Sequence, residues 1–62
     1  MEKKFNVIQE RSVGRFAVLT LRGFQPKGNG INPLALDEDL AVSLAFTFTI
    51  ETCRACWIEE AK

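Results

Sequence analysis

The clearest pattern along the chain is an alternation of large apolar residues with smaller or polar ones between Leu40 and Ile50. Side chains at every second position share one face of a β-strand, and β-branched and aromatic residues, in which this segment is rich, favour strands. The alternation predicts a long strand over residues 40–50. Its apolar face would consist of Leu40, Val42, Leu44, Phe46, Phe48 and Ile50.

A helix is the competing interpretation of the same segment. Apolar residues at positions 36, 40, 44 and 48 are spaced four apart and would form a helical stripe. At about 100° per residue, however, Val42 and Phe46 would point away from that stripe. We therefore favour the strand, which places all of the large apolar residues on one face.

Three further segments are typical of strands or turns. Residues 5–9 predict a short first strand, and residues 10–14 a hairpin turn. Residues 15–24 predict a second strand that is apolar on both faces, as in a sheet covered on both sides or at a subunit contact. The tail after Ile50 fits either a return strand holding Trp57 and Ile58 or a short helix capped by Thr52.

The segment 25–33 contains both prolines and two glycines, which predicts a loop. Asn32 followed by Pro33 resembles the start of a helix, so we expect at most one helical turn over residues 33–37. The acidic run Asp37–Asp39 comes too late to cap that turn. The expected fold is mainly β: a small antiparallel sheet or partly open barrel of three or four strands, with at most a short helical turn.

A chain of 62 residues forms one domain, spanning residues 1–62. In so small a domain, the free energy gained by burying apolar surface roughly equals the conformational entropy lost on folding, which costs about 1.5 kcal/mol per residue. A disulfide, a metal or a partner subunit is therefore usually needed for stability. The apolar face of the predicted long strand also needs a cover. We therefore expect a homodimer or higher oligomer formed over that face, and expect Phe46→Asp to dissociate and unfold the protein together.

Charge adds a second reason to expect pairing. Eight Lys and Arg residues balance eight Asp and Glu residues, so no net charge attracts nucleic acid or anionic lipid. Residues 1–31 hold six of the cations and two of the acids, and residues 32–62 hold the reverse. This complementarity favours contacts within the chain or between copies, unless the charges are simply solvated.

The composition argues against catalysis. The chain has no histidine, which removes the commonest general base and metal ligand and excludes a Ser-His-Asp triad within one chain. Asp37–Asp39 are not spaced like a calcium loop, and Gly28–Gly30 lack the spacing of a phosphate-binding loop. We do not expect an enzyme.

Cys53 and Cys56 form the one chemical motif that stands out, a CxxC pair. Zinc needs four ligands, so these cysteines would hold it only if two copies shared the ion; otherwise no cofactor is expected. A redox pair requires an electropositive setting, which Arg54 favours and the nearby acids oppose. Structural or incidental thiols are the third interpretation.

Basic and aromatic residues interleave around the predicted second strand, as on small β-barrels that bind single-stranded nucleic acid. The residues of this alternative site are Arg15, Phe16, Arg22 and Lys27. The core of a sheet needs phenylalanines in any case, so we rank nucleic-acid binding below protein interaction.

The charged amino terminus does not resemble a secretory signal, and the segment 40–50 is too short to cross a membrane. We expect a cytoplasmic protein with no membrane partner. The leading functional hypothesis is a non-catalytic adaptor or inhibitor that binds itself, and possibly another protein, through its sheet and the loop 25–33.

Overall fold

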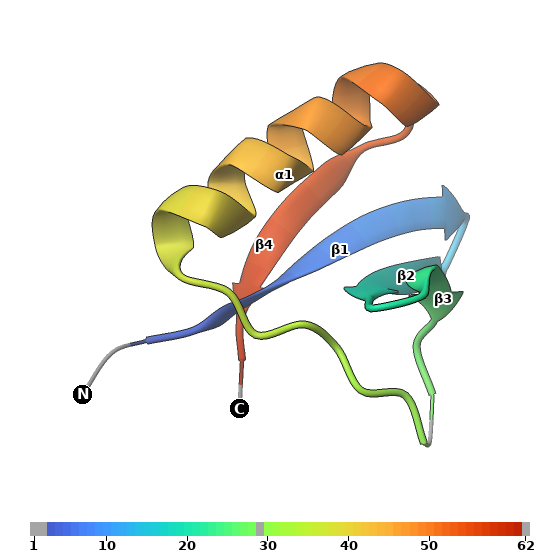
Figure 1. The fold of residues 1–62 in the computed structure, drawn as a ribbon. Coiled ribbons are helices and arrows are strands. Elements are labelled where there is room, and N and C mark those ends of the chain that lie inside the picture. The colour runs from blue at the N-terminus through green and yellow to red at the C-terminus, as the bar shows by residue number, and fades with distance from the viewer. Residues whose placement is uncertain (1–2, 29, 62) are drawn as a thin grey trace.

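The computed structural model describes residues 3–28 and 30–61. A four-stranded antiparallel sheet, in the order β3-β2-β1-β4, carries one helix on one of its faces (Figure 1). The elements in chain order are β1 (Phe5–Ser12), β2 (Arg15–Thr20), β3 (Gly23–Pro26), α1 (Glu38–Thr52) and β4 (Cys56–Glu60). The prediction of a mainly β fold built on a small antiparallel sheet is confirmed, and the sheet is open.

The first hairpin forms as predicted, but β1 continues to Ser12, three residues beyond the predicted strand, so the turn is confined to Val13 and Gly14. β1 pairs with β2, and the connection ends at Gly14, whose φ of 76° suits glycine. The predicted strand over residues 15–24 is instead two strands, because the chain reverses at Leu21 and Arg22. The Thr20 hydroxyl holds this turn: it accepts from the Arg22 N–H at 3.1 Å and donates to the Gly23 carbonyl at 2.8 Å.

The prediction of a strand over residues 40–50 is wrong, because this segment lies within α1, a helix of 15 residues. The helix begins at the acidic run: the Asp37 side chain accepts from the Leu40 N–H at 3.3 Å and caps it. Glu38 and Asp39 in the first turn complement the positive end of the helix dipole. The helical turn expected over residues 33–37 does not form, and the helix exceeds the single turn expected.

Thr49, from the segment predicted as a strand, and Thr52, considered as the cap of a short helix in the tail, instead fasten the end of α1 to the sheet. The Thr49 hydroxyl donates to the Ala45 carbonyl at 2.8 Å and accepts from the Cys56 N–H at 3.1 Å. The Thr52 hydroxyl donates within the helix and accepts from the amide of Gln9 at 2.9 Å. Gln9 is buried, so this contact satisfies a polar group that would otherwise be costly.

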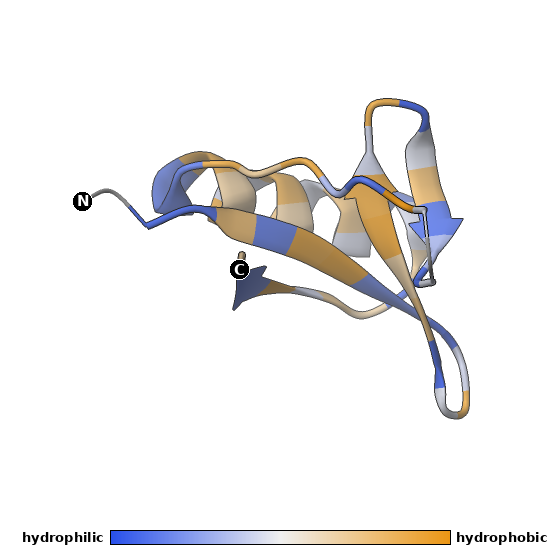
Figure 2. Ribbon diagram, turned by 90° about the horizontal axis from the view of Figure 1, so that it is seen from below, coloured by the Kyte–Doolittle hydropathy of each residue, from blue (hydrophilic) through white to orange (hydrophobic). Residues whose placement is uncertain are grey.

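The core lies between α1 and the sheet. Val7 and Leu19 of the sheet meet Ala41 and Ala45 of the helix, and all four are buried. The two alanines let the helix backbone approach the sheet closely. Around them pack the partly buried residues Phe5, Phe24, Leu34, Leu36, Leu44, Phe48, Cys56 and Ile58. Figure 2 shows hydrophobic residues along β1, β2 and α1.

The tail after α1 forms a return strand, β4, and not the short helix capped by Thr52 that was the alternative. β4 pairs antiparallel with β1, with Ile58 beside Val7 and Trp57 beside Ile8. On the other side of β1, Leu36 forms a bridge with Phe5. The segment before the helix thus extends the sheet past the end of β2.

The face of the sheet away from α1 has a small apolar cluster of its own. Ile8 and Val18, paired across β1 and β2, are each only 2% exposed. Phe16 of β2 and Trp57 of β4 meet over β1, edge to face, with ring centroids 5.7 Å apart. This pair covers the cluster, which explains why residues 15–24 are apolar on both faces.

Candidate functional site

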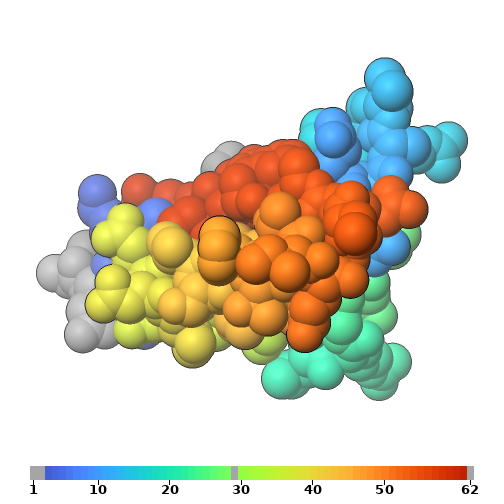
Figure 3. Space-filling model, turned by 90° about the horizontal axis from the view of Figure 1, so that it is seen from above, coloured from blue at the N-terminus to red at the C-terminus, as the bar shows by residue number. Residues whose placement is uncertain are grey.

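The outer side of α1 presents a row of large apolar side chains. Val42, Phe46 and Ile50 are 51%, 68% and 62% exposed, and their spacing of four places them along one side of the helix. We call these three residues the helix stripe. Figure 3 looks onto this side of the molecule, where α1, in yellow to orange, lies across the surface.

The helix is therefore apolar on two opposite sides. Ala41 and Ala45 face the sheet and are buried, and Leu44 and Phe48 pack against them. A helix that is apolar all round is normally covered all round, whereas residues 3–28 and 30–61 cover only the sheet side of α1. The stripe is the unpartnered half.

The predicted interface of Leu40, Val42, Leu44, Phe46, Phe48 and Ile50 does not share one face, because a helix separates residues that a strand would align. Leu44 and Phe48 belong to the core, while Leu40 and the stripe are exposed. The expectation that Phe46→Asp unfolds the protein is revised accordingly. With Phe46 on the outer side of α1, the variant should keep its fold.

The two ends of the stripe differ in charge. At its start lie Asp37, Glu38 and Asp39, all exposed. The last turn of α1 has no basic residue, but Arg54 follows directly and donates to the Arg11 carbonyl at 2.6 Å. Glu51 in the last turn is exposed as well, so the surface is acidic at the start of the helix, apolar in the middle, and carries one charge of each sign at its end.

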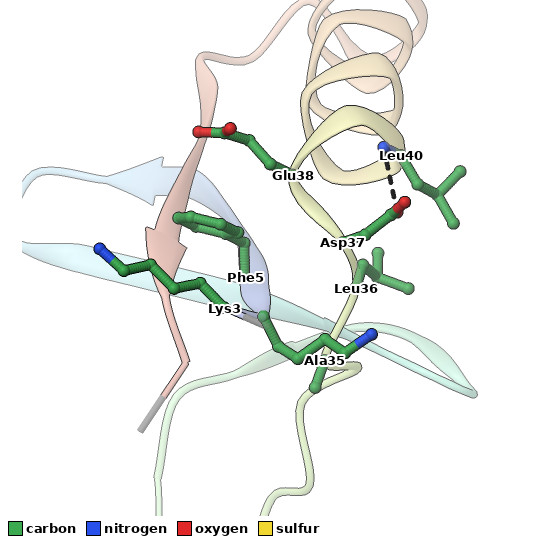
Figure 4. Close-up of a pocket in the computed structure, with 8 residues that line it drawn as sticks. Lys3, Phe5, Ala35, Leu36, Asp37, Glu38 and Leu40 are labelled. Atoms are coloured by element: carbon green, nitrogen blue, oxygen red, sulfur yellow. Dashed lines mark hydrogen bonds between the residues drawn. The ribbon is translucent and has the colours of Figure 1, made fainter. Parts of the chain in front are cut away.

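An open hollow of about 730 Å³ lies beside the start of α1 (Figure 4). Its lining consists of Lys3, Lys4, Phe5, Ala35, Leu36, Asp37, Glu38 and Leu40. The polar groups here serve the fold: Asp37 caps the helix, and Lys3 pairs with Glu60 at 3.8 Å.

The structure brings together three of the four residues of the alternative nucleic-acid site. Arg15, Phe16 and Lys27 line one open hollow, whereas Arg22 lies in the turn at the far end of β2. Sequence reasoning missed Trp57, whose ring packs against Phe16; no local signal identifies it, since β4 is distant along the chain.

Glu59 lies beside Trp57 and Lys27, next to this alternative site. The Glu59 carboxylate accepts from the Trp57 indole N–H at 3.2 Å and pairs with the Lys27 ammonium at 3.7 Å. Lys27 follows β3 and Glu59 belongs to β4, so this pair links the two edge strands of the sheet. Part of the positive charge of the hollow is thereby neutralised.

Cys53 and Cys56 are free thiols at the end of α1. Cys53 is exposed and takes the left-handed conformation that ends the helix, with φ of 56°, while Cys56 packs at the edge of the core. Over residues 3–28 and 30–61, no three His, Cys, Asp or Glu side chains gather in a way that could hold a metal ion. A metal would require ligands from a second chain.

In comparisons with known proteins, no family model, no curated protein and no solved structure matches this chain. Among the described residues, no helix is long and apolar enough to span a membrane.

Proposed function

We propose that this chain is a non-catalytic protein-interaction module that binds its partner through the helix stripe rather than through the sheet. The observation that carries the proposal is the exposure of Val42, Phe46 and Ile50 on a helix whose other side already fills the core. A helix commonly docks on another protein through apolar anchors spaced three or four residues apart along one side.

The energetics favour coverage of this surface. An aromatic side chain buries roughly 150–250 Å² when enclosed, and Phe46 leaves about two thirds of its surface in water. At about 25 cal/mol per Å², covering that remainder contributes about 3 kcal/mol. Phe46 is therefore the expected centre of the interface, with Val42 and Ile50 on either side.

The test compares Phe46→Asp with Leu21→Asp. Leu21 is 90% exposed in the turn between β2 and β3, so both variants add one charge at an exposed apolar position. Both should keep the wild-type far-UV circular dichroism. Proteins captured by wild type and by Leu21→Asp should be lost with Phe46→Asp; their retention by Phe46→Asp would refute binding through the stripe.

A second candidate is binding of single-stranded nucleic acid at the hollow lined by Arg15, Phe16 and Lys27. Its favouring observation is the Phe16–Trp57 ring pair beside two cations, since rings that stack bases next to cations that track phosphates are typical of such sites. Trp57 is the sole tryptophan, so oligo(dT) should quench its fluorescence, and salt should reverse the effect steeply. Absence of quenching at low salt would rule this candidate out.

A further inference from the structure

We infer that the partner of the helix stripe is a second copy of this chain, with the two α1 helices packed antiparallel about a two-fold axis at Phe46. This inference rests on the proposed function and specifies its partner. It follows from the symmetry of the stripe, the charges at its ends and the area of exposed surface.

The stripe is symmetric about its middle residue. Val42 and Ile50 lie four residues on either side of Phe46, about 6 Å along the helix axis in each direction. In an antiparallel pair, Phe46 therefore faces its own copy, and Val42 faces Ile50 of the second copy. Small residues, Ser43 and Thr47, flank the stripe and leave room for close approach.

The charges select the antiparallel direction. Glu38 and Arg54 are placed symmetrically about Phe46, eight residues before and after it. An antiparallel pair brings the acidic start of each helix to the end of the other that carries both Glu51 and Arg54, and it also opposes the two helix dipoles. A parallel pair would instead place Asp37, Glu38 and Asp39 beside the same acids of the second copy.

The surface area of the chain fits a dimer. A compact monomer of 7.0 kDa exposes about 4,000 Å², whereas this chain exposes 4702 Å². For two copies, the exposed surface exceeds that of two compact monomers by about 1,400 Å², which falls within the roughly 1,200–2,000 Å² that specific interfaces bury. The turn residues Val13 and Leu21 account for part of this excess, and Val42, Phe46 and Ile50 of the stripe for another part.

The arrangement also bears on the cysteines. Because Cys53 lies seven residues beyond Phe46, the two-fold axis places it about 10 Å along the helix axis from the centre, at opposite ends in the two copies. The two CxxC pairs are then too far apart to share one zinc ion, whose ligands lie about 2.3 Å from the metal.

The first measurement is native mass spectrometry of the reduced protein, together with sedimentation at micromolar concentration. We expect a metal-free species of twice the chain mass for wild type and for Leu21→Asp, and a folded species of single mass for Phe46→Asp. A monomeric wild type, or a dimer that survives Phe46→Asp, would overturn the inference.

The second measurement reports direction. In a background of Cys53→Gly and Cys56→Ala, Val42→Cys and Ile50→Cys are made as separate proteins, mixed under reducing conditions and then oxidised. Antiparallel helices give a disulfide-linked dimer in the mixture, with little from either protein alone, because a disulfide requires Cα atoms within about 7 Å. Disulfide-linked dimers in the Val42→Cys protein by itself would show that the helices are parallel, and would overturn the antiparallel arrangement.

The two proposals fail in different ways. If purified wild type is a monomer while capture of another protein still depends on Phe46, the self-pairing inference is wrong and the proposed function stands. If neither the oligomeric state nor capture depends on Phe46, both are wrong.

Discussion

Phe46 and Phe48 are two residues apart, yet α1 places them on opposite sides, which allows a direct test of the fold. Phe48 packs against the core, and its ring meets Phe24 edge to face with centroids 5.0 Å apart. Truncation of a core phenylalanine costs about 3–5 kcal/mol. Because Phe48 is only partly buried, we expect Phe48→Ala to lower the free energy of unfolding by about 2–4 kcal/mol, of which the Phe24 contact supplies about 1 kcal/mol.

Phe46→Ala should behave differently. Its side chain is 68% exposed, and alanine has the higher helix propensity by about 0.5 kcal/mol, so the isolated chain should be unchanged or slightly more stable. The assay is urea unfolding followed by far-UV circular dichroism and by Trp57 fluorescence, at a protein concentration low enough to keep the chain monomeric.

A domain of this size has only about 3–5 kcal/mol of stability, so Phe48→Ala leaves little folded baseline to measure. Phe48→Leu, which retains an apolar side chain but loses the ring contact, then supplies the comparison, with an expected loss of about 1 kcal/mol. Equal losses for Phe46→Ala and Phe48→Ala would refute the helix, because a strand over residues 40–50 would place both rings on one buried face.

Other perturbations follow from the ends of the helix. Asp37→Ala should cost about 1 kcal/mol through loss of the cap, and Asp37→Asn, which keeps an acceptor, should cost less in the same urea titration; equal losses would contradict the capping role. Cys53→Gly should stabilise the protein by about 0.5–1 kcal/mol by relieving the left-handed backbone, and a matching gain from Cys53→Ala would argue against strain as the cause. Thr52→Val should cost about 1–2 kcal/mol, because it deprives the buried Gln9 amide of its acceptor; thermal unfolding with Glu51→Gln as a surface control measures this.

Some features of this protein are local in origin, and the sequence alone predicts them. Gly14 lies in a short turn that follows the polar residues 10–12 and separates two apolar runs, and such a turn closes wherever the flanking strands pair. The alternation around Val7 and the apolar pair at Trp57 and Ile58 likewise suffice to predict the first strand and to suggest the last. The absence of histidine from the chain weighs against several catalytic chemistries without any structure.

The helix was decided by tertiary structure. Residues 40–50 carry apolar side chains compatible with both a period of two and a period of four, so local pattern cannot choose between them. The choice depends on partners elsewhere in the chain: Val7 and Leu19 form a surface that Ala41 and Ala45 fit closely, and Gln9 offers an amide to Thr52. A helix satisfies these contacts, with Asp37 as its cap.

The candidate site has the same origin. In a helix, Val42 and Phe46 point away from Leu44 and Phe48, and this argued against a helix. In the structure, the same geometry leaves Val42 and Phe46 exposed. The sequence determines that the segment is apolar on more than one side. Only the packing of α1 on the sheet decides which of those side chains fill the core and which remain at the surface for a partner, because burial depends on what the rest of the chain places against each residue.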